Sequence, residues 1–104
     1  MNVATTEKRP LEVWKFGGAS LADVAAIERA VELIRRHKGP LVIVASALGG
    51  VTDLLLEGAA AATSGRRAEA ARAAATFLRR HRDVARGLIP AGPARRRLLA
   101  TIDE

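Results

Sequence analysis

Two short apolar runs, each followed by a Gly-Gly pair, constrain the fold of this chain more than any other feature. The first run, residues 11–16, ends at Gly17-Gly18, and the second, residues 41–45, leads into a loop with the Gly-Gly pair 49–50. Runs rich in β-branched and aromatic residues that end at glycine predict β-strands. The second run is apolar without alternation, which is typical of a strand covered on both faces in a parallel sheet.

A helix is predicted between the two strands. The S-x-x-D pattern from Ser20 to Asp23 has the form of a capping box at its start. The apolar residues that follow are spaced as on one face of a helix, at Val24, Ile27, Val31 and Ile34. Basic residues at 35–38 suit the negative end of the helix dipole, and the Gly-Pro pair at 39–40 ends the helix. His37 is therefore better explained as a C-terminal helix residue than as a catalyst.

Three further helices are predicted after the second Gly-Gly pair. Thr52 is the expected N-cap of the first, and Asp53 lies in its first turn. The second runs from about 66 to 86 after a break at 63–65, and the third starts near Ala94 after a Pro/Gly-rich turn. The second has an apolar stripe that we expect to be buried, formed by Ala70, Ala74, Phe77 and Leu78.

Strand, helix, strand in this order predicts a right-handed βαβ unit with parallel strands, and so an α/β fold. Its 104 residues suffice for one small domain, which we place at residues 11–104 after a flexible segment 1–10. Two parallel strands make a poor independent domain, because parallel sheets need further strands and cover on both faces. We therefore expect a truncated chain: the N-terminal βαβ unit of a larger domain, followed by helices.

Composition excludes several classes of site. The chain contains no cysteine, which excludes disulfides, thiol catalysis and Cys-ligated metal. Its two histidines, His37 and His81, are not clustered with acids, so we expect no metal-ligating residues. The polar start has no signal-peptide pattern, and no apolar run approaches the length of a membrane span, so we expect a cytoplasmic protein without membrane contact.

The net charge of +6 raises the question of nucleic-acid binding. Most of the charge is arginine after position 65, scattered along alanine-rich helices in the manner of solvated faces. Aromatic residues that stack on bases make up only 3% of the chain, so nucleic acid is not an expected partner. A non-catalytic binding module built on these basic helices remains an alternative.

The two strand-to-helix loops carry the residues with chemical potential. In open α/β sheets, ligands bind at the carboxyl ends of the strands, and glycine-rich loops before helices attract phosphate or carboxylate. Lys15, within the first strand, either extends to the sheet edge or places its ammonium in this crevice against an anion. Ser46 and Thr52 are a turn serine and an N-cap threonine on local grounds, and their hydroxyls would face the same crevice. Neither a Walker P-loop nor a G-x-G-x-x-G motif is present.

The segment 13–20, V-W-K-F-G-G-A-S, resembles the K-F-G-G-[TS]-S signature that opens aspartate kinases of the amino acid kinase superfamily. Residues 42–47 with 49–53, V-I-V-A-S-A and G-G-V-T-D, resemble the family's V-V-x-S-A segment and its G-[VI]-T-[ND] continuation. The match runs from about residue 11 to 58. One departure is Ala19, which stands where threonine or serine is usual, so a hydroxyl contact from that position is lost.

The resemblance implies roles for individual residues. Lys15 would be the catalytic cation that stabilises the transferred phosphate, with the Gly17 and Gly18 backbone and Ser20 in the phosphate cradle. Substrate contacts would come from the second loop, at Ser46, Ala47 and Thr52.

The implied fold is the three-layer sandwich of the amino acid kinases, here incomplete. The implied reaction is phosphoryl transfer from ATP, with Mg²⁺ on its phosphates, to the β-carboxylate of L-aspartate, which begins lysine, threonine and methionine biosynthesis. The family's His-Gly-Glu segment, nucleotide-binding half and ACT domains have no counterpart here, so we expect the 104-residue chain alone to be inactive and the full-length enzyme to be a homo-oligomer. A fusion to homoserine dehydrogenase and another kinase of the superfamily remain alternatives.

Overall fold

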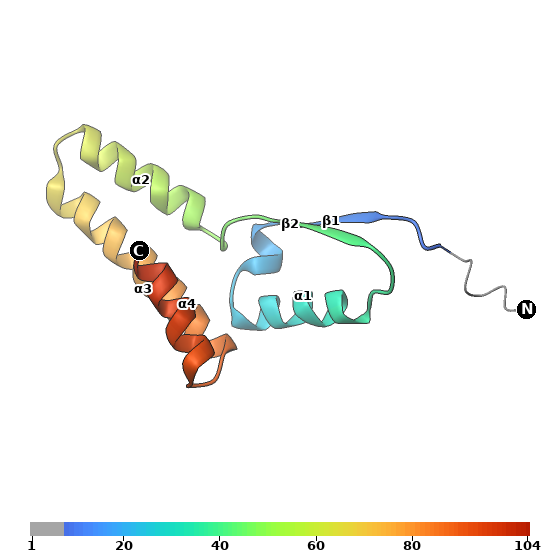
Figure 1. The fold of residues 1–104 in the computed structure, drawn as a ribbon. Coiled ribbons are helices and arrows are strands. Elements are labelled where there is room, and N and C mark those ends of the chain that lie inside the picture. Colours follow the sequence, from blue (N-terminus) through green and yellow to red (C-terminus); the bar gives the residue numbers. More distant parts are fainter. Residues whose placement is uncertain (1–7) are drawn as a thin grey trace, which may run out of the picture.

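The computed structural model describes residues 8–104, and the expected flexible segment 1–10 lies largely outside them. Its elements are β1 (Glu12–Phe16), the 3-10 helix η2 (Gly18–Leu21), α1 (Val24–Arg36), β2 (Leu41–Ala45), α2 (Val51–Thr63), α3 (Arg67–Leu88) and α4 (Pro93–Asp103). The predicted α/β class, with an N-terminal βαβ unit followed by helices, is confirmed. Figure 1 shows two parts, the βαβ unit and an arm of three helices, joined where β2 leads into α2.

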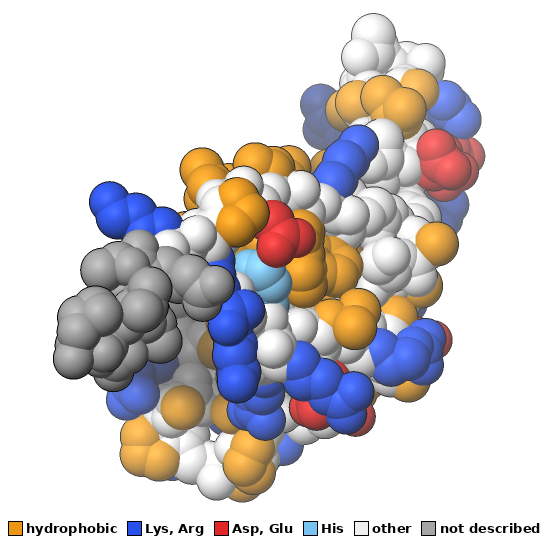
Figure 2. All heavy atoms as spheres, turned by 90° about the vertical axis from the view of Figure 1, so that its right-hand side faces the viewer, with side chains coloured by type: hydrophobic (Ala, Val, Ile, Leu, Met, Phe, Trp, Pro, Cys, Tyr) orange, Lys and Arg blue, Asp and Glu red, His pale blue; other side chains and the backbone are white. Residues whose placement is uncertain are grey.

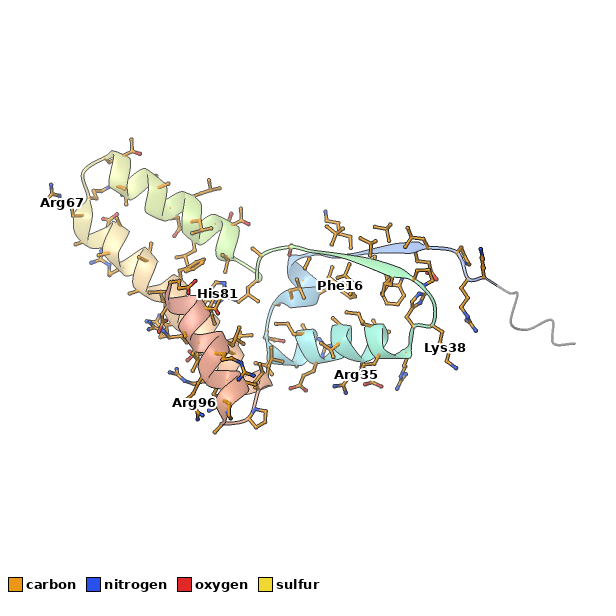
Figure 3. All side chains as sticks on the ribbon, viewed as in Figure 1. Phe16, Arg35, Lys38, Arg67, His81 and Arg96 are labelled. Carbon is orange, nitrogen blue, oxygen red and sulfur yellow. The ribbon has the colours of Figure 1, made fainter. Side chains whose placement is uncertain are left out.

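The βαβ unit is held together by a parallel pair of strands and by aromatic contacts to α1. β1 and β2 pair in parallel, with Glu12 opposite Leu41 and Phe16 opposite Ala45. Phe16 is buried, and in Figure 3 it lies between the strands and α1. The Trp14 ring stacks edge-on against His37, with 4.9 Å between centroids. His37 is thus the C-cap of α1 and part of this packing, as its position in the sequence predicts.

The opposite face of the sheet is open in this chain. In-register pairing places Val13 beside Val42 and Lys15 beside Val44 on that face. Val13 is 64% exposed and Val44 is 46% exposed. The prediction that β2 is covered on both faces is therefore wrong for the described residues: only the α1 side has a covering helix. Figure 2, which views the molecule from the N-terminal end of the βαβ unit, shows hydrophobic side chains at the surface among lysines and arginines.

The three C-terminal helices follow the predicted breaks closely. α2 ends at Thr63, and Gly65, at φ +75, turns the chain so that α3 packs back along α2. α4 begins with Pro93 at its first turn and packs against α3. The stripe predicted to be buried faces α2 across a shallow apolar groove of about 420 Å³. It is not buried, however: Ala74 is exposed, and Ala70, Phe77 and Leu78 are half-buried.

Two predicted helix caps are wrong. The N-cap of α1 is Asp23, whose Oδ1 accepts a hydrogen bond of 2.8 Å from the Ala26 N–H, whereas Ser20 lies in η2. α2 begins at Val51 after Gly50, whose φ of +80 is left-handed, so Thr52 lies inside the first turn and not at the cap. Asp53 is in the first turn of α2, as predicted.

The chain buries little of itself. Its radius of gyration is 18.7 Å, whereas a compact domain of this length has about 13 Å. The buried hydrophobic residues among those described are Phe16, Ala26, Ala30, Val51, Ala61 and Ala85. No helix in residues 8–104 combines the length and apolar character that crossing a bilayer requires.

Candidate functional site

The two glycine loops meet at the carboxyl ends of the two strands. The Ser46 N–H donates to the Phe16 carbonyl at 2.9 Å, which continues the strand pairing into the loops. The Gly49 N–H donates to the Leu21 carbonyl at 3.3 Å. A Cβ built on Gly49 would lie 3.1 Å from the Gly18 carbonyl oxygen and 3.1 Å from the Ala22 Cα. The backbones therefore approach so closely that a side chain at Gly49 would require the neighbouring loop to shift by a few tenths of an ångström.

Lys15 lies beside this junction on the open face of the sheet. It is the penultimate residue of β1 and pairs with Val44, two residues before Ser46. Its side chain is exposed, whereas the next residue, Phe16, is buried on the α1 side. This exposure fits either of the two alternatives left by the sequence. Lys15 and Ser46 come from adjacent strands and lie at the same edge.

Backbone N–H groups at the junction are available to a ligand. Among the described residues, no backbone hydrogen bond uses the N–H of Gly17, Gly18 or Ala19. The first turn of α2 offers further N–H groups, at Thr52 and Asp53, as helix N-termini do. Free N–H donors near a lysine favour a negatively charged ligand. The Asp53 carboxylate in the same turn disfavours the high charge of a phosphate there, which leaves the first loop as the better phosphate site.

The remaining predicted site residues lie on the two loops, but their hydroxyls do not all project freely. The Ser46 hydroxyl donates to the carbonyl of Ala47 at 2.6 Å. A substrate would have to compete with this bond. Thr52, on the first turn of α2, and Ser20, in η2, are exposed.

One side chain that the sequence did not indicate reaches the junction from α3. The Arg80 guanidinium donates from Nη1 to the Gly49 carbonyl and from Nη2 to the Ala22 carbonyl, the latter at 3.3 Å. Arg80 is one of ten arginines after position 65, and nothing in the helical spacing separates it from its neighbours. Other arginines of this region are also used internally. Arg82 pairs with Asp103 at 2.6 Å, and Arg95 donates to the Ile89 and Arg86 carbonyls at 2.8 Å.

A model of the amino acid kinase family matches residues 10–99, which is most of the chain. The chain belongs to the amino acid kinase family. This amino acid kinase chain is also similar to an aspartokinase of Chlamydia muridarum (strain MoPn / Nigg), with 49% identity over 51 residues. That match covers 49% of this chain and 11% of the relative, so the chain spans only a small part of the relative's length. No solved structure gives a significant match to this chain.

The described part of this amino acid kinase does not form a metal site by itself. Residues 8–104 contain no group of three or more His, Cys, Asp or Glu residues placed to hold a metal ion. Mg²⁺ is usually held by one or two carboxylates together with substrate phosphates and water. Such a site needs fewer protein ligands than a group of three supplies, and no residue of 8–104 is assigned to Mg²⁺.

Proposed function

We propose that this chain is the front of the kinase domain of an aspartate kinase, which transfers the γ-phosphoryl group of ATP to the β-carboxylate of L-aspartate. The observation that carries the proposal is the contact between the two glycine loops at one sheet edge, beside Lys15. Two loops so close together can hold two reactants in line. The likeness to an aspartokinase over 51 residues supports aspartate as the acceptor.

In this proposal the first loop and Lys15 bind the transferred phosphoryl group. The N–H groups of Gly17 and Gly18 point charge-stabilising donors at its oxygens, and the Lys15 ammonium balances the negative charge. Ser20 lies on the same loop and is proposed to contact the phosphates. The second loop holds the acceptor, with Ser46, Ala47 and Thr52 as contacts to aspartate.

The reaction needs positioning and charge stabilisation, and no general base. A β-carboxylate oxygen attacks the γ-phosphorus, the bond from phosphorus to the bridging oxygen breaks, and ADP leaves with that electron pair. No proton has to be removed from the attacking oxygen, because a carboxylate is already ionised at neutral pH. This agrees with a junction that offers donors and a cation but no histidine.

Steady-state kinetics on the complete gene product tests the proposal. With ATP and L-aspartate we expect ADP release, together with a 4-phospho-L-aspartate product that hydroxylamine traps as the hydroxamate. L-Glutamate and N-acetyl-L-glutamate serve as matched acceptors. Both have one methylene more than aspartate, and the second also has an acetylated amine. Turnover with either of these in place of aspartate would reassign the substrate within the family, and no turnover with any of the three would refute the proposal.

A further inference from the structure

Arg80 joins two segments that are distant in sequence. Its two donors reach the Gly49 carbonyl, 31 residues away, and the Ala22 carbonyl, 58 residues away. Gly49 belongs to the loop proposed to hold aspartate, and Ala22 directly follows η2, in the loop proposed to hold phosphate. One guanidinium on α3 therefore contacts both strand-to-helix connections from outside the site.

A second contact fixes α3 in this place. A Cβ built on Gly87 would lie 2.6 Å from the Val24 Cγ2, so α3 packs directly on the first residue of α1. Gly87 is seven residues after Arg80, and the two therefore project from the same face of α3. Figure 1 shows the later part of α3 passing close to the start of α1. Arg80 is thus carried by a helix whose position relative to the βαβ unit is set independently of its own hydrogen bonds.

The chemistry of the contact is specific to a guanidinium. Arg80 is half-buried and lies in a shallow depression lined also by Asp23 and Asp83. Its planar fork presents two donors in fixed directions, which a single ammonium cannot do. Both donors are engaged with carbonyl groups of the loops and not aimed at a ligand. The side chain is therefore suited to holding the loops and not to binding phosphate.

We infer that Arg80 is a positioning residue that clamps the phosphate loop and the acceptor loop at a fixed separation. This inference rests on the proposed function, because the clamp matters to catalysis only if the loops hold the two reactants. In-line transfer depends on the relative placement of the carboxylate and the phosphoryl group, and a misplacement of about 1 Å can cost on the order of 10²-fold in rate. Arg80 would thus set the alignment without touching either substrate.

The test compares Arg80→Ala and Arg80→Lys with Arg79→Ala in the complete gene product. Arg79 is the adjacent, exposed arginine of α3, so its removal changes the charge equally without touching the loops. Hydrogen–deuterium exchange is followed over residues 17–23 and 46–53, with α3 as an internal reference. Without substrates, Arg80→Ala should speed exchange in both loops but not in α3, and Arg79→Ala should leave exchange unchanged.

Kinetics separate positioning from simple stabilisation. We expect Arg80→Ala to raise KM for aspartate and to lower kcat/KM by about 10- to 100-fold. Arg80→Lys should fall between Arg80→Ala and wild type, and it serves as the test variant if Arg80→Ala does not fold. Unchanged loop exchange in the Arg80 variants would overturn the inference. So would a fall in apparent kcat no larger than the fall in the folded fraction of the variant, since a smaller folded fraction alone has that effect.

Exchange without substrates also distinguishes this inference from the proposed function. If the wild-type protein does not phosphorylate aspartate but the Arg80 variants loosen both loops, the clamp stands and the proposed function fails. If aspartate turnover is present and the Arg80 variants match wild type in both measurements, the clamp fails and the function stands.

Discussion

Substituting Gly49 with alanine tests the closest contact of the junction. The new Cβ would lie 3.1 Å from the Ala22 Cα, 3.1 Å from the Gly18 carbonyl oxygen and 3.3 Å from the Ala22 Cβ. Carbon atoms in optimal contact are about 3.5–4.0 Å apart. Two of the three neighbouring atoms are backbone, so relief requires the loops to separate. Gly49 is not among the glycines with positive φ, so the cost is steric and does not come from the backbone conformation.

The magnitude follows from two opposing terms. Overpacking of this kind costs about 1–3 kcal/mol. Replacing glycine by alanine also restricts the unfolded chain, which returns about 0.4–1 kcal/mol where the conformation is compatible. The net expectation for Gly49→Ala is a loss of up to about 2.5 kcal/mol in the free energy of unfolding, with the middle of the range near 1 kcal/mol.

Gly17→Ala is the matched control. A Cβ there meets no atom within 4 Å, and the backbone is extended, at φ −81 and ψ −176. We expect this variant to match wild type or to gain up to about 1 kcal/mol, from the unfolded-chain term alone. The assay is chemical denaturation of the complete gene product, followed by circular dichroism. Equal stability of the two variants would refute the close approach of the loops.

Three further predictions concern Lys15, the cap of α1 and the chain itself. Lys15→Ala should lower kcat on the order of 10²-fold with folding intact, because one charge-stabilising donor is lost. The control Lys38→Ala, at the other end of the βαβ unit, should keep wild-type rates. Equal rates in the two variants would remove Lys15 from the mechanism. Asp23→Ala should reduce the free energy of unfolding by about 0.5–2 kcal/mol, because the cap of α1 is lost. The reduction should exceed that of Asp53→Ala, for which no capping bond is seen in the described residues. Denaturation curves in which Asp53→Ala is the less stable variant would contradict this. The 104-residue chain expressed alone should show no ATP-dependent turnover. In sedimentation velocity it should self-associate, because the apolar face of its sheet is open. A monomeric, active chain would contradict both expectations.

The element order was predictable because each boundary carries strong local chemistry. Glycine or proline lies at 39–40, 65 and 90–93, and the structure breaks at each of these points, whereas Gly58 and Gly87 lie inside helices. The parallel pairing of β1 and β2 follows from the helix between them. The meeting of the two loops was predictable for the same reason, since the carboxyl ends of adjacent parallel strands share an edge.

The caps were predicted wrongly because local patterns offered two acceptable residues. Ser20 and Asp23 are both good N-caps, and the choice of Asp23 accompanies the η2 turn, in which Leu21 accepts from Gly49 on the other loop. Thr52 lost its predicted cap position because the left-handed Gly50 takes the N-cap two residues earlier, so that the helix starts at Val51. In both cases a contact or a backbone conformation outside the local pattern decided the boundary.

Burial and the Arg80 contact were beyond the reach of sequence patterns. An unbroken apolar run such as β2 predicts cover on both faces, but it does not say whether the covering elements lie within these residues. Arg80 resembles its neighbours in charge and spacing, and its partners lie 31 and 58 residues away. Only the packing of α3 on α1, through Gly87 and Val24, selects it.

The most direct measurement is a crystal structure of the complete gene product with a non-hydrolysable ATP analogue and L-aspartate. The γ-phosphate should lie within hydrogen-bonding distance of the Lys15 ammonium and the Gly17 or Gly18 N–H, with the aspartate β-carboxylate between it and the Ser46 loop. A nucleotide and an acceptor bound away from these two loops would contradict the account.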